Sequence, residues 1–212
     1  MKKLLSIILS CLISVVVLSQ QTTKDLQKEL KDKAMREARK EAKKYEKAGW
    51  SVAPGSIPLA KVLENTWMKQ VMSDDKGNVI YISGDGNAVG ETKSAAELQA
   101  VELGKLQLAG LIQTNMSSLI SANIGNAQLT TQEAASVTEI VQSAKNIIAM
   151  ELGYVDPSFK LFRNIGNDKI EVQVRLMYDT RQSLEIAKKV VRQELKDKLK
   201  LNEGKLEKLM GI

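Results

Sequence analysis

The stretch "YISGDGNAVGET" at residues 81–92 decides how the chain folds, because three glycines there join an apolar run to a long helical pattern. Gly84, Gly86 and Gly90 are spaced G-x-G-x-x-x-G, whereas a dinucleotide-binding turn has G-x-G-x-x-G directly after a strand. Glycines inside a strand often mark a bulge or a sharp bend. The stretch predicts a strand over residues 78–89 that bulges or bends at Gly84 and Gly86, and then a turn at Gly90.

The charges of this stretch also differ from those of a phosphate-binding loop. Such a loop ends in Gly-Lys-Ser or Gly-Lys-Thr, but Glu91 stands where its lysine belongs and Asp85 where its first glycine belongs. Because both carboxylates repel phosphate, a structural role for the glycines is favoured. The alternative is a small-ligand or nucleotide-binding enzyme that uses the Gly84–Gly90 loop.

One long helix is predicted over residues 94–121, with Thr92 or Ser94 as its N-cap. Large apolar residues near one face predict its buried side, opposite Glu97, Lys105 and Gln113. They are Ala95, Leu98, Val101, Leu108, Ile112, Met116 and Leu119, with Leu103, Leu106 and Leu111 widening the face. Small residues would let the helix approach a sheet closely, and these are Ala96, Ala100, Gly104, Ala109 and Gly110.

The second half of the chain predicts a helix, a hairpin and a final helix. Thr130 and Glu133 have the spacing of a capping box at the start of a helix over residues 130–149. Apolar residues alternate on both sides of the turn "NIGND" and predict two strands with one face on helices and the other toward water or a partner. They are Phe159, Leu161, Ile170, Val172, Val174 and Leu176. Residues 181–212 predict an amphipathic helix with a stripe through Leu184, Ala187, Val191, Leu195 and Leu199.

These patterns predict an α+β fold, a small antiparallel sheet packed against two or more helices in the order strand, helix, helix, strand, strand, helix. The core domain is expected at residues 79–180, between a charged N-terminal helix at 20–48 and the C-terminal helix at 181–212. The N-terminal helix has a narrow, weakly apolar stripe through Leu26, Leu30, Ala34, Ala38, Ala42 and Tyr45.

A connecting segment at residues 49–78 contains Pro54, Pro58 and a short predicted helix near residues 59–72. Its two tryptophans allow two interpretations. Trp50 and Trp67 either fasten the segment to the core, which is favoured, or line a ligand groove.

The first 19 residues have the features of a secretory signal peptide. Lys2 and Lys3 precede an apolar run of about 15 residues, which is short for a membrane span, and Ser19 offers a cleavage point. A single-span anchor is one alternative. Another is a lipoprotein box that makes Cys11, the only cysteine, the lipidated first residue. The signal peptide predicts an exported protein.

The net charge of +6 is unevenly distributed. Residues 24–47 and 181–208 each carry +4, whereas the residues between them carry −4. Nucleic-acid binding is not expected, because acidic residues are interspersed with the basic ones and the signal peptide predicts export. The basic helices instead suggest peripheral contact with a membrane, whereas an envelope-protein partner or a second copy is expected to bind through an open strand edge or through the apolar helical stripes.

Few residues offer chemistry. The chain has no histidine, and its acidic pairs near loops, Asp74 with Asp75 and Asp85 with Glu91, fall short of the three or more oxygens that a metal needs. No serine lies in a G-x-S-x-G or S-x-x-K context. The sequence therefore assigns no catalytic, cofactor-binding or metal-ligating residue, and a non-enzymatic protein is predicted.

Residues 81–112 and the later "KIEVQVRLMYD" at 169–179 resemble a known group of envelope domains. They are similar to the small lipoprotein-twenty family and to the N-terminal domain of flagellar assembly protein T, within uncharacterised secreted proteins of Gram-negative bacteria. The matching residues are Gly84, Gly86, Ala95, Ala96, Ala100, Val172 and Val174. The resemblance covers roughly residues 79–180 and implies an exported, non-enzymatic interaction or assembly module with no shared catalytic site. It also implies a location in the periplasm or at the outer membrane of a Gram-negative bacterium.

Overall fold

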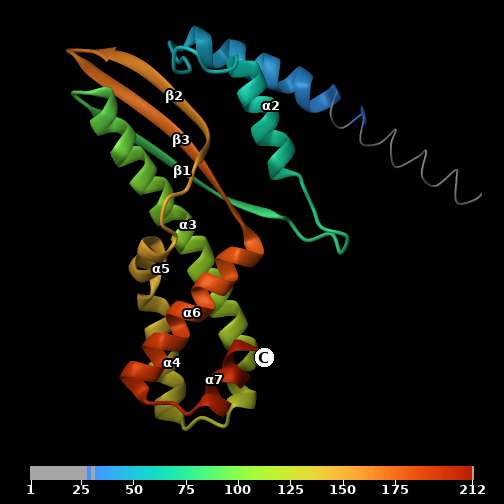
Figure 1. Ribbon diagram of the computed structural model, residues 1–212, viewed down its shortest axis with the longest axis vertical. Coiled ribbons are helices and arrows are strands. Elements are labelled where there is room, and N and C mark those ends of the chain that lie inside the picture. Colours follow the sequence, from blue (N-terminus) through green and yellow to red (C-terminus); the bar gives the residue numbers. More distant parts are fainter. Residues whose placement is uncertain (1–27, 30–31, 212) are drawn as a thin grey trace, which may run out of the picture.

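The computed structural model describes residues 28–29 and 32–211, which form an elongated molecule with a sheet toward one end and a helical bundle toward the other (Figure 1). A helix at residues 32–47 comes first. The further elements are α2 (Leu59–Gln70), β1 (Tyr81–Gly90), α3 (Lys93–Asn123), a 3₁₀ turn η1 (Ile124–Ala127), α4 (Thr131–Ser143), α5 (Lys145–Glu151), β2 (Pro157–Gly166), β3 (Lys169–Asp179), α6 (Thr180–Leu199) and α7 (Glu203–Met210). The predicted α+β class is confirmed.

The sheet has the order β1-β3-β2, and both pairings are antiparallel. The predicted hairpin turn is confirmed, because Gly166, Asn167 and Asp168 adopt positive φ angles of 85°, 50° and 55° between β2 and β3. The predicted bulge in the first strand is wrong. Pairing of β1 with β3 runs without a shift from Tyr81 to Gly90, and the irregularities lie in β2 instead.

The glycines of β1 serve contact with a helix rather than a bend. A Cβ added to Gly86 would lie 1.8 Å from the carbonyl oxygen of Ala100, and one added to Gly84 would lie 2.4 Å from that of Gly104. None of the β1 glycines has a positive φ. Their missing side chains therefore let the backbone of α3 lie against the strand, where any other residue would separate the two.

Helix α3 starts where the sequence predicted, since the Thr92 side chain accepts a hydrogen bond from the Ala95 amide at 3.2 Å. Its buried face is only partly the predicted one. Leu108 and Ile112 are buried, but Leu98 is 65% exposed. The small residues Ala96, Ala100 and Gly104 are buried in its place, because the sheet packs on the side of the helix that allows the closest approach.

Two further corrections concern the helices beyond the sheet. The predicted helix over 130–149 is divided at Ala144 into α4 and α5, although the capping box of Thr130 and Glu133 is confirmed. The predicted C-terminal helix ends at Leu199, because Lys200 adopts a left-handed conformation and Asn202 then caps α7. A large apolar cluster joins all three strands, with Phe162 as its β2 member, and all the helices from α3 onward.

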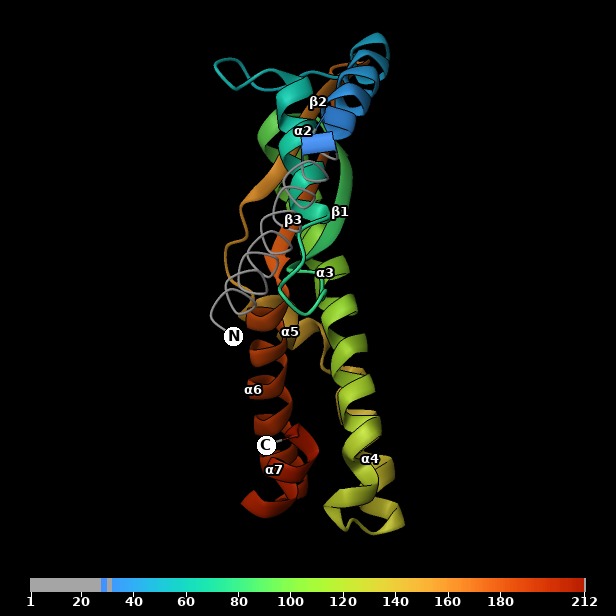
Figure 2. The same ribbon diagram turned by 90° about the vertical axis from the view of Figure 1, so that its right-hand side faces the viewer.

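The second face of the sheet is covered by the chain itself, contrary to the expectation that it faces water or a partner. Helix 32–47 and α2 lie across this end of the molecule, as the two views show (Figures 1 and 2). They share a smaller apolar cluster with two residues of β2. Its buried members are Ala38, Ala42, Trp50, Leu59, Leu63, Phe159 and Leu161.

Several predictions fall on residues that the structure does not describe. These are the signal peptide with Cys11, and Leu26 and Leu30 of the N-terminal stripe. Among the described residues, no helix combines the length and the apolar character that crossing a bilayer requires.

Candidate interaction surface

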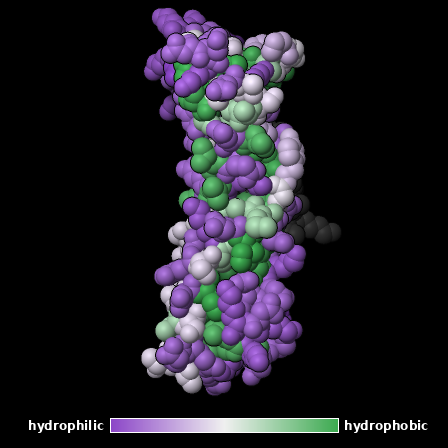
Figure 3. All heavy atoms as spheres, turned by 90° about the vertical axis from the view of Figure 1, so that its left-hand side faces the viewer, coloured by the Kyte–Doolittle hydropathy of each residue, from purple (hydrophilic) through white to green (hydrophobic). Residues whose placement is uncertain are grey.

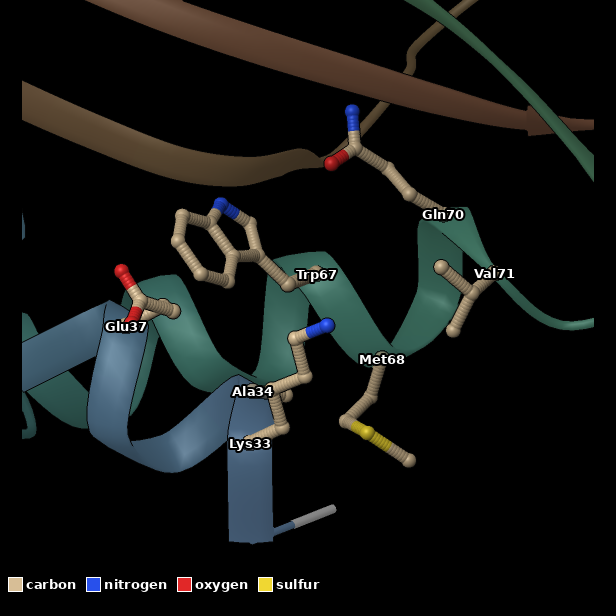
Figure 4. A pocket seen from close by; sticks show the side chains of 7 residues that line it. All are labelled: Lys33, Ala34, Glu37, Trp67, Met68, Gln70 and Val71. Atoms are coloured by element: carbon tan, nitrogen blue, oxygen red, sulfur yellow. The ribbon is translucent and has the colours of Figure 1, made fainter. Parts of the chain in front are cut away.

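An apolar groove lies between helix 32–47 and α2. Its volume is about 360 Å³. Three of its lining residues come from the first helix, three from α2, and one is Val71, which follows the last residue of α2 (Figure 4). They are Lys33, Ala34, Glu37, Trp67, Met68, Gln70 and Val71. Because both helices are amphipathic and only their inner stripes pack together, the groove remains at the outer side of that contact.

Apolar surface continues from the groove onto the following turn. Val71 is 65% exposed, and Met72 and Val79 are exposed beside it. The turn is fixed by hydrogen bonds, because the Ile80 amide donates to the carbonyl of Met72 at 3.0 Å. Exposed apolar residues that cluster in this way mark contact surfaces more often than isolated ones do.

The rim of the groove carries charge of both signs. Lys33 and Glu37 line it, and Glu37 forms an ion pair with Lys40 at 2.8 Å. A hydrogen bond from Lys40, aided by the charge of that lysine, holds the pKa of Glu37 below its ordinary value. Helix 32–47 has seven basic and four acidic residues, so the groove lies beside a net positive surface.

The two tryptophans divide between the two predicted roles. Trp50 is buried in the smaller cluster, where Arg163 stacks 4.6 Å from its ring centre, so this residue fastens the connecting segment to the sheet. Trp67 is half-buried and lines the groove. The sequence does not show which tryptophan has which role, because that depends on the segments that the fold brings against each of them.

Beneath helix 32–47 the sheet carries a layer of paired charges. Arg175 on β3 donates to both carboxylate oxygens of Asp85 on β1, at 2.6 and 2.8 Å, and lies 5.3 Å from the ring centre of Phe159. Hydrogen bonding to Asp85, more than any other effect, raises the pKa of Arg175. Asp85 therefore has a structural partner across the strands.

A second set of polar contacts lies on the same face. Glu171 accepts hydrogen bonds from Arg163 and, at 2.9 Å, from Asn87. Burial is the largest single influence on the pKa of Glu171 and acts to raise it, but the hydrogen bonds from Asn87 and Arg163, with the positive charge of Arg163, outweigh burial and hold the pKa below its ordinary value. These contacts join all three strands.

Glu41 is the exception in this layer. It projects from helix 32–47, and its Oε2 atom is buried without a hydrogen-bond partner. Burial raises the pKa of Glu41, and the positive charge of Arg175 only partly opposes that effect. The sequence offered no sign of this, because Glu41 resembles the exposed acidic residues around it.

The other residues that the sequence considered for ligand or metal binding have structural roles. Gly84, Gly86 and Gly90 lie within a strand and not a loop, with the backbone of α3 against them. The Asp74 carboxylate accepts hydrogen bonds from the backbone of Lys76 and Asn78, and so closes its own turn. Within residues 32–211, no cluster of three acidic, histidine or cysteine side chains is placed to hold a metal.

The chain was compared with protein-family models, with curated proteins and with solved structures. None of the three comparisons gives a match.

Proposed function

We propose that this protein is an exported, non-enzymatic component of the Gram-negative cell envelope, and that it acts as an interaction or assembly module. The observation that carries the proposal is the apolar groove between helix 32–47 and α2. The predicted resemblance of residues 79–180 to envelope assembly domains favours the same function. Export, to the periplasm or to the outer membrane, rests on the pattern of residues 1–19.

The groove suits an amphipathic segment of a protein partner. Trp67, Met68 and Val71 offer apolar area, and the flexible methionine can adapt to the shape of an inserted side chain. The groove is open along one side, so a helix can lie in it with one or two apolar residues inserted. The basic residues of helix 32–47 also allow peripheral contact with anionic lipid, as the sequence suggested.

Charge favours an acidic partner. The exposed residues Lys33, Lys40 and Lys44 of the first helix would meet carboxylates that flank an inserted apolar side chain. Such attraction speeds association and weakens as salt is added, because charges farther apart than about 8 Å are screened at physiological ionic strength.

Photo-crosslinking in intact cells tests the groove. A photoreactive amino acid replaces Met68 in the groove or, as a control, Leu98, an exposed position on α3. We expect a discrete adduct with an envelope protein from position 68 and none from position 98. The adduct should disappear when Val71→Glu places a charge in the apolar groove.

Two outcomes would contradict the proposal. One is equal crosslinking from both positions, and the other is an adduct that survives Val71→Glu. Export is tested separately by the intact mass of the purified protein. A chain that begins near Gln20 without lipid is expected, whereas a lipidated chain that begins at Cys11 would contradict this processing.

The alternative, a nucleotide- or small-ligand-binding enzyme, has its own test. Thermal melts with nucleotides and divalent metals should leave the melting temperature unchanged if the module proposal is correct. A reproducible increase with one nucleotide would favour the alternative.

A further inference from the structure

The two edges of the sheet differ in how this chain covers them. At the β2 edge, Ser51 and Phe162 exchange two backbone hydrogen bonds of 2.9 Å, and the Thr66 hydroxyl donates to the carbonyl of Ser158. At the β1 edge, within residues 32–211, no other backbone pairs with the strand between Ser83 and Val89.

The outward backbone groups of β1 can be identified from one contact. The Asp85 amide donates to the side-chain oxygen of Gln107 and so points away from β3. Because successive residues of a strand alternate in direction, Ser83, Asn87 and Val89 have the same outward orientation as Asp85. This edge contains no proline and no lysine, the residues with which proteins commonly block an exposed edge.

An apolar stripe of α3 follows the same edge. Leu103, Gln107 and Leu111 are four residues apart and therefore share one side of the helix. Since Gln107 reaches Asp85, that side lies along the outer edge of β1. Leu103 and Leu111 are 47% and 43% exposed. Apolar surface runs in separate patches along the side of the molecule that α3 and α5 help to form (Figure 3).

We propose that β1 pairs antiparallel with β1 of a second copy, so that two sheets join into one across a two-fold axis. In such a pairing, residues whose backbone groups point outward must lie opposite outward-pointing residues of the second copy, so only a few registers are possible. Pairing about Asp85 would oppose two carboxylates. Pairing about Gly86 instead places Asp85 opposite Asn87 of the second copy, where an amide can donate to a carboxylate, and Ser83 opposite Val89.

The helices beneath the sheet fit the same register. Gly86 lies against the turn of α3 that runs from Ala100 to Gly104, and Leu103 belongs to this turn. Because the two-fold axis would pass beside Gly86, it would also place Leu103 next to Leu103 of the second copy. Gly104 faces both Gly84 on β1 and Leu176 on β3, so α3 lies between these strands. With strands about 4.8 Å apart, the two copies of α3 would be roughly 10 Å apart, a normal distance for packed helices.

Self-association is measured on the purified protein and is independent of the partner in the groove. Sedimentation velocity over a range of concentrations should show a dimer. Val89→Pro removes an outward amide without touching the β1–β3 hydrogen bonds, and Leu103→Lys adds a charge to the apolar stripe. Each should weaken dimerisation at least about tenfold. Leu98→Lys, a matched control elsewhere on α3, should not.

Two further variants test the geometry. Gln107→Ala removes the side chain that caps the Asp85 amide and should strengthen dimerisation. In a chain with Cys11→Ser, oxidation of Leu103→Cys should give a covalent dimer, whereas Leu98→Cys should not. A protein that is monomeric up to about 100 µM would overturn the proposal. A dimer that Val89→Pro and Leu103→Lys both leave intact would also overturn it.

Discussion

The two faces of the small sheet are covered in different ways. On one face, Gly84 and Gly86 bring the strand into contact with the backbone of α3, and the residues around them are buried and apolar. On the other face, helix 32–47 lies over paired charges with few large apolar side chains of its own. Close fit holds the first face, and a mixture of charge pairs and a small apolar cluster holds the second. The second should therefore separate more easily.

The largest effect is expected when the close fit is broken. Gly86→Val would place side-chain atoms where the Ala100 carbonyl lies, so strand and helix must separate. Overpacking usually destabilises by about 1–3 kcal/mol, but here the obstacle is backbone, and we expect loss of the native fold. The physical reason is this contact and not a positive φ at Gly86.

Urea denaturation followed by circular dichroism measures this effect. Gly125→Ala is the control, since a Cβ there meets nothing within 4 Å, and it should change stability by less than about 0.5 kcal/mol. If Gly86→Val unfolds at the same urea concentration as the unmodified protein, the close fit does not hold this face.

Removing apolar volume from the same face should have the next largest effect. Leu108 is fully buried, and Leu108→Ala should lower the free energy of unfolding by about 2–5 kcal/mol. Leu98→Ala makes the same chemical change at an exposed site of α3 and should cost less than about 0.5 kcal/mol. Equal losses in urea melts would mean that the apolar face of α3 is assigned wrongly.

A smaller effect is expected on the charged face. Arg175→Met removes the cation from the Asp85 carboxylate, which is 45% exposed, and we expect a loss of about 1 kcal/mol. Amide hydrogen exchange should rise more in helix 32–47 than in α3, because only the former lies over this layer. Lys189→Ala breaks an exposed ion pair with Glu151 and should change stability by less than about 0.5 kcal/mol. Unchanged exchange in helix 32–47 would show that Arg175 does not hold it.

The smallest expected effect is the response of helix 32–47 to pH. Burial raises the pKa of Glu41 above its ordinary 4.5, so packing favours the protonated carboxyl. The stability that Glu41 contributes to the packing of helix 32–47 is fully present below pH 4.5, where the carboxyl is protonated, and is lost as pH rises through the raised pKa. Hydrogen exchange of this helix should therefore show weaker packing above that window than below it, after correction for the intrinsic rate.

Glu41→Gln should remove this difference while leaving the opposite pH responses of Glu171 and Asp74, whose pKa values are lowered. Glu41 faces Arg175 across the layer, and Lys44 lies near it on its own helix. An unchanged pH profile in Glu41→Gln would contradict the assignment.

Much of the fold could be predicted from the sequence, because the relevant signals are local. Alternating residues located the hairpin, and the caps at Thr92 and Thr130 located two helix starts. The breaks at Ala144 and Lys200 were missed, since neither residue is a helix breaker. Little of the candidate site could be predicted, because the groove is formed by two segments that only the fold brings together.

The sequence by itself determined the class of the fold and the positions of its strands and long helices, since hydrophobic period and capping act within a few residues. Only the tertiary structure decided which side of α3 is buried and what covers the second face of the sheet. The physical reason is that a small residue contributes little apolar area. Ala100, Gly86 and Ala38 are buried or in close contact because of what lies opposite them, and those neighbours come from distant parts of the chain.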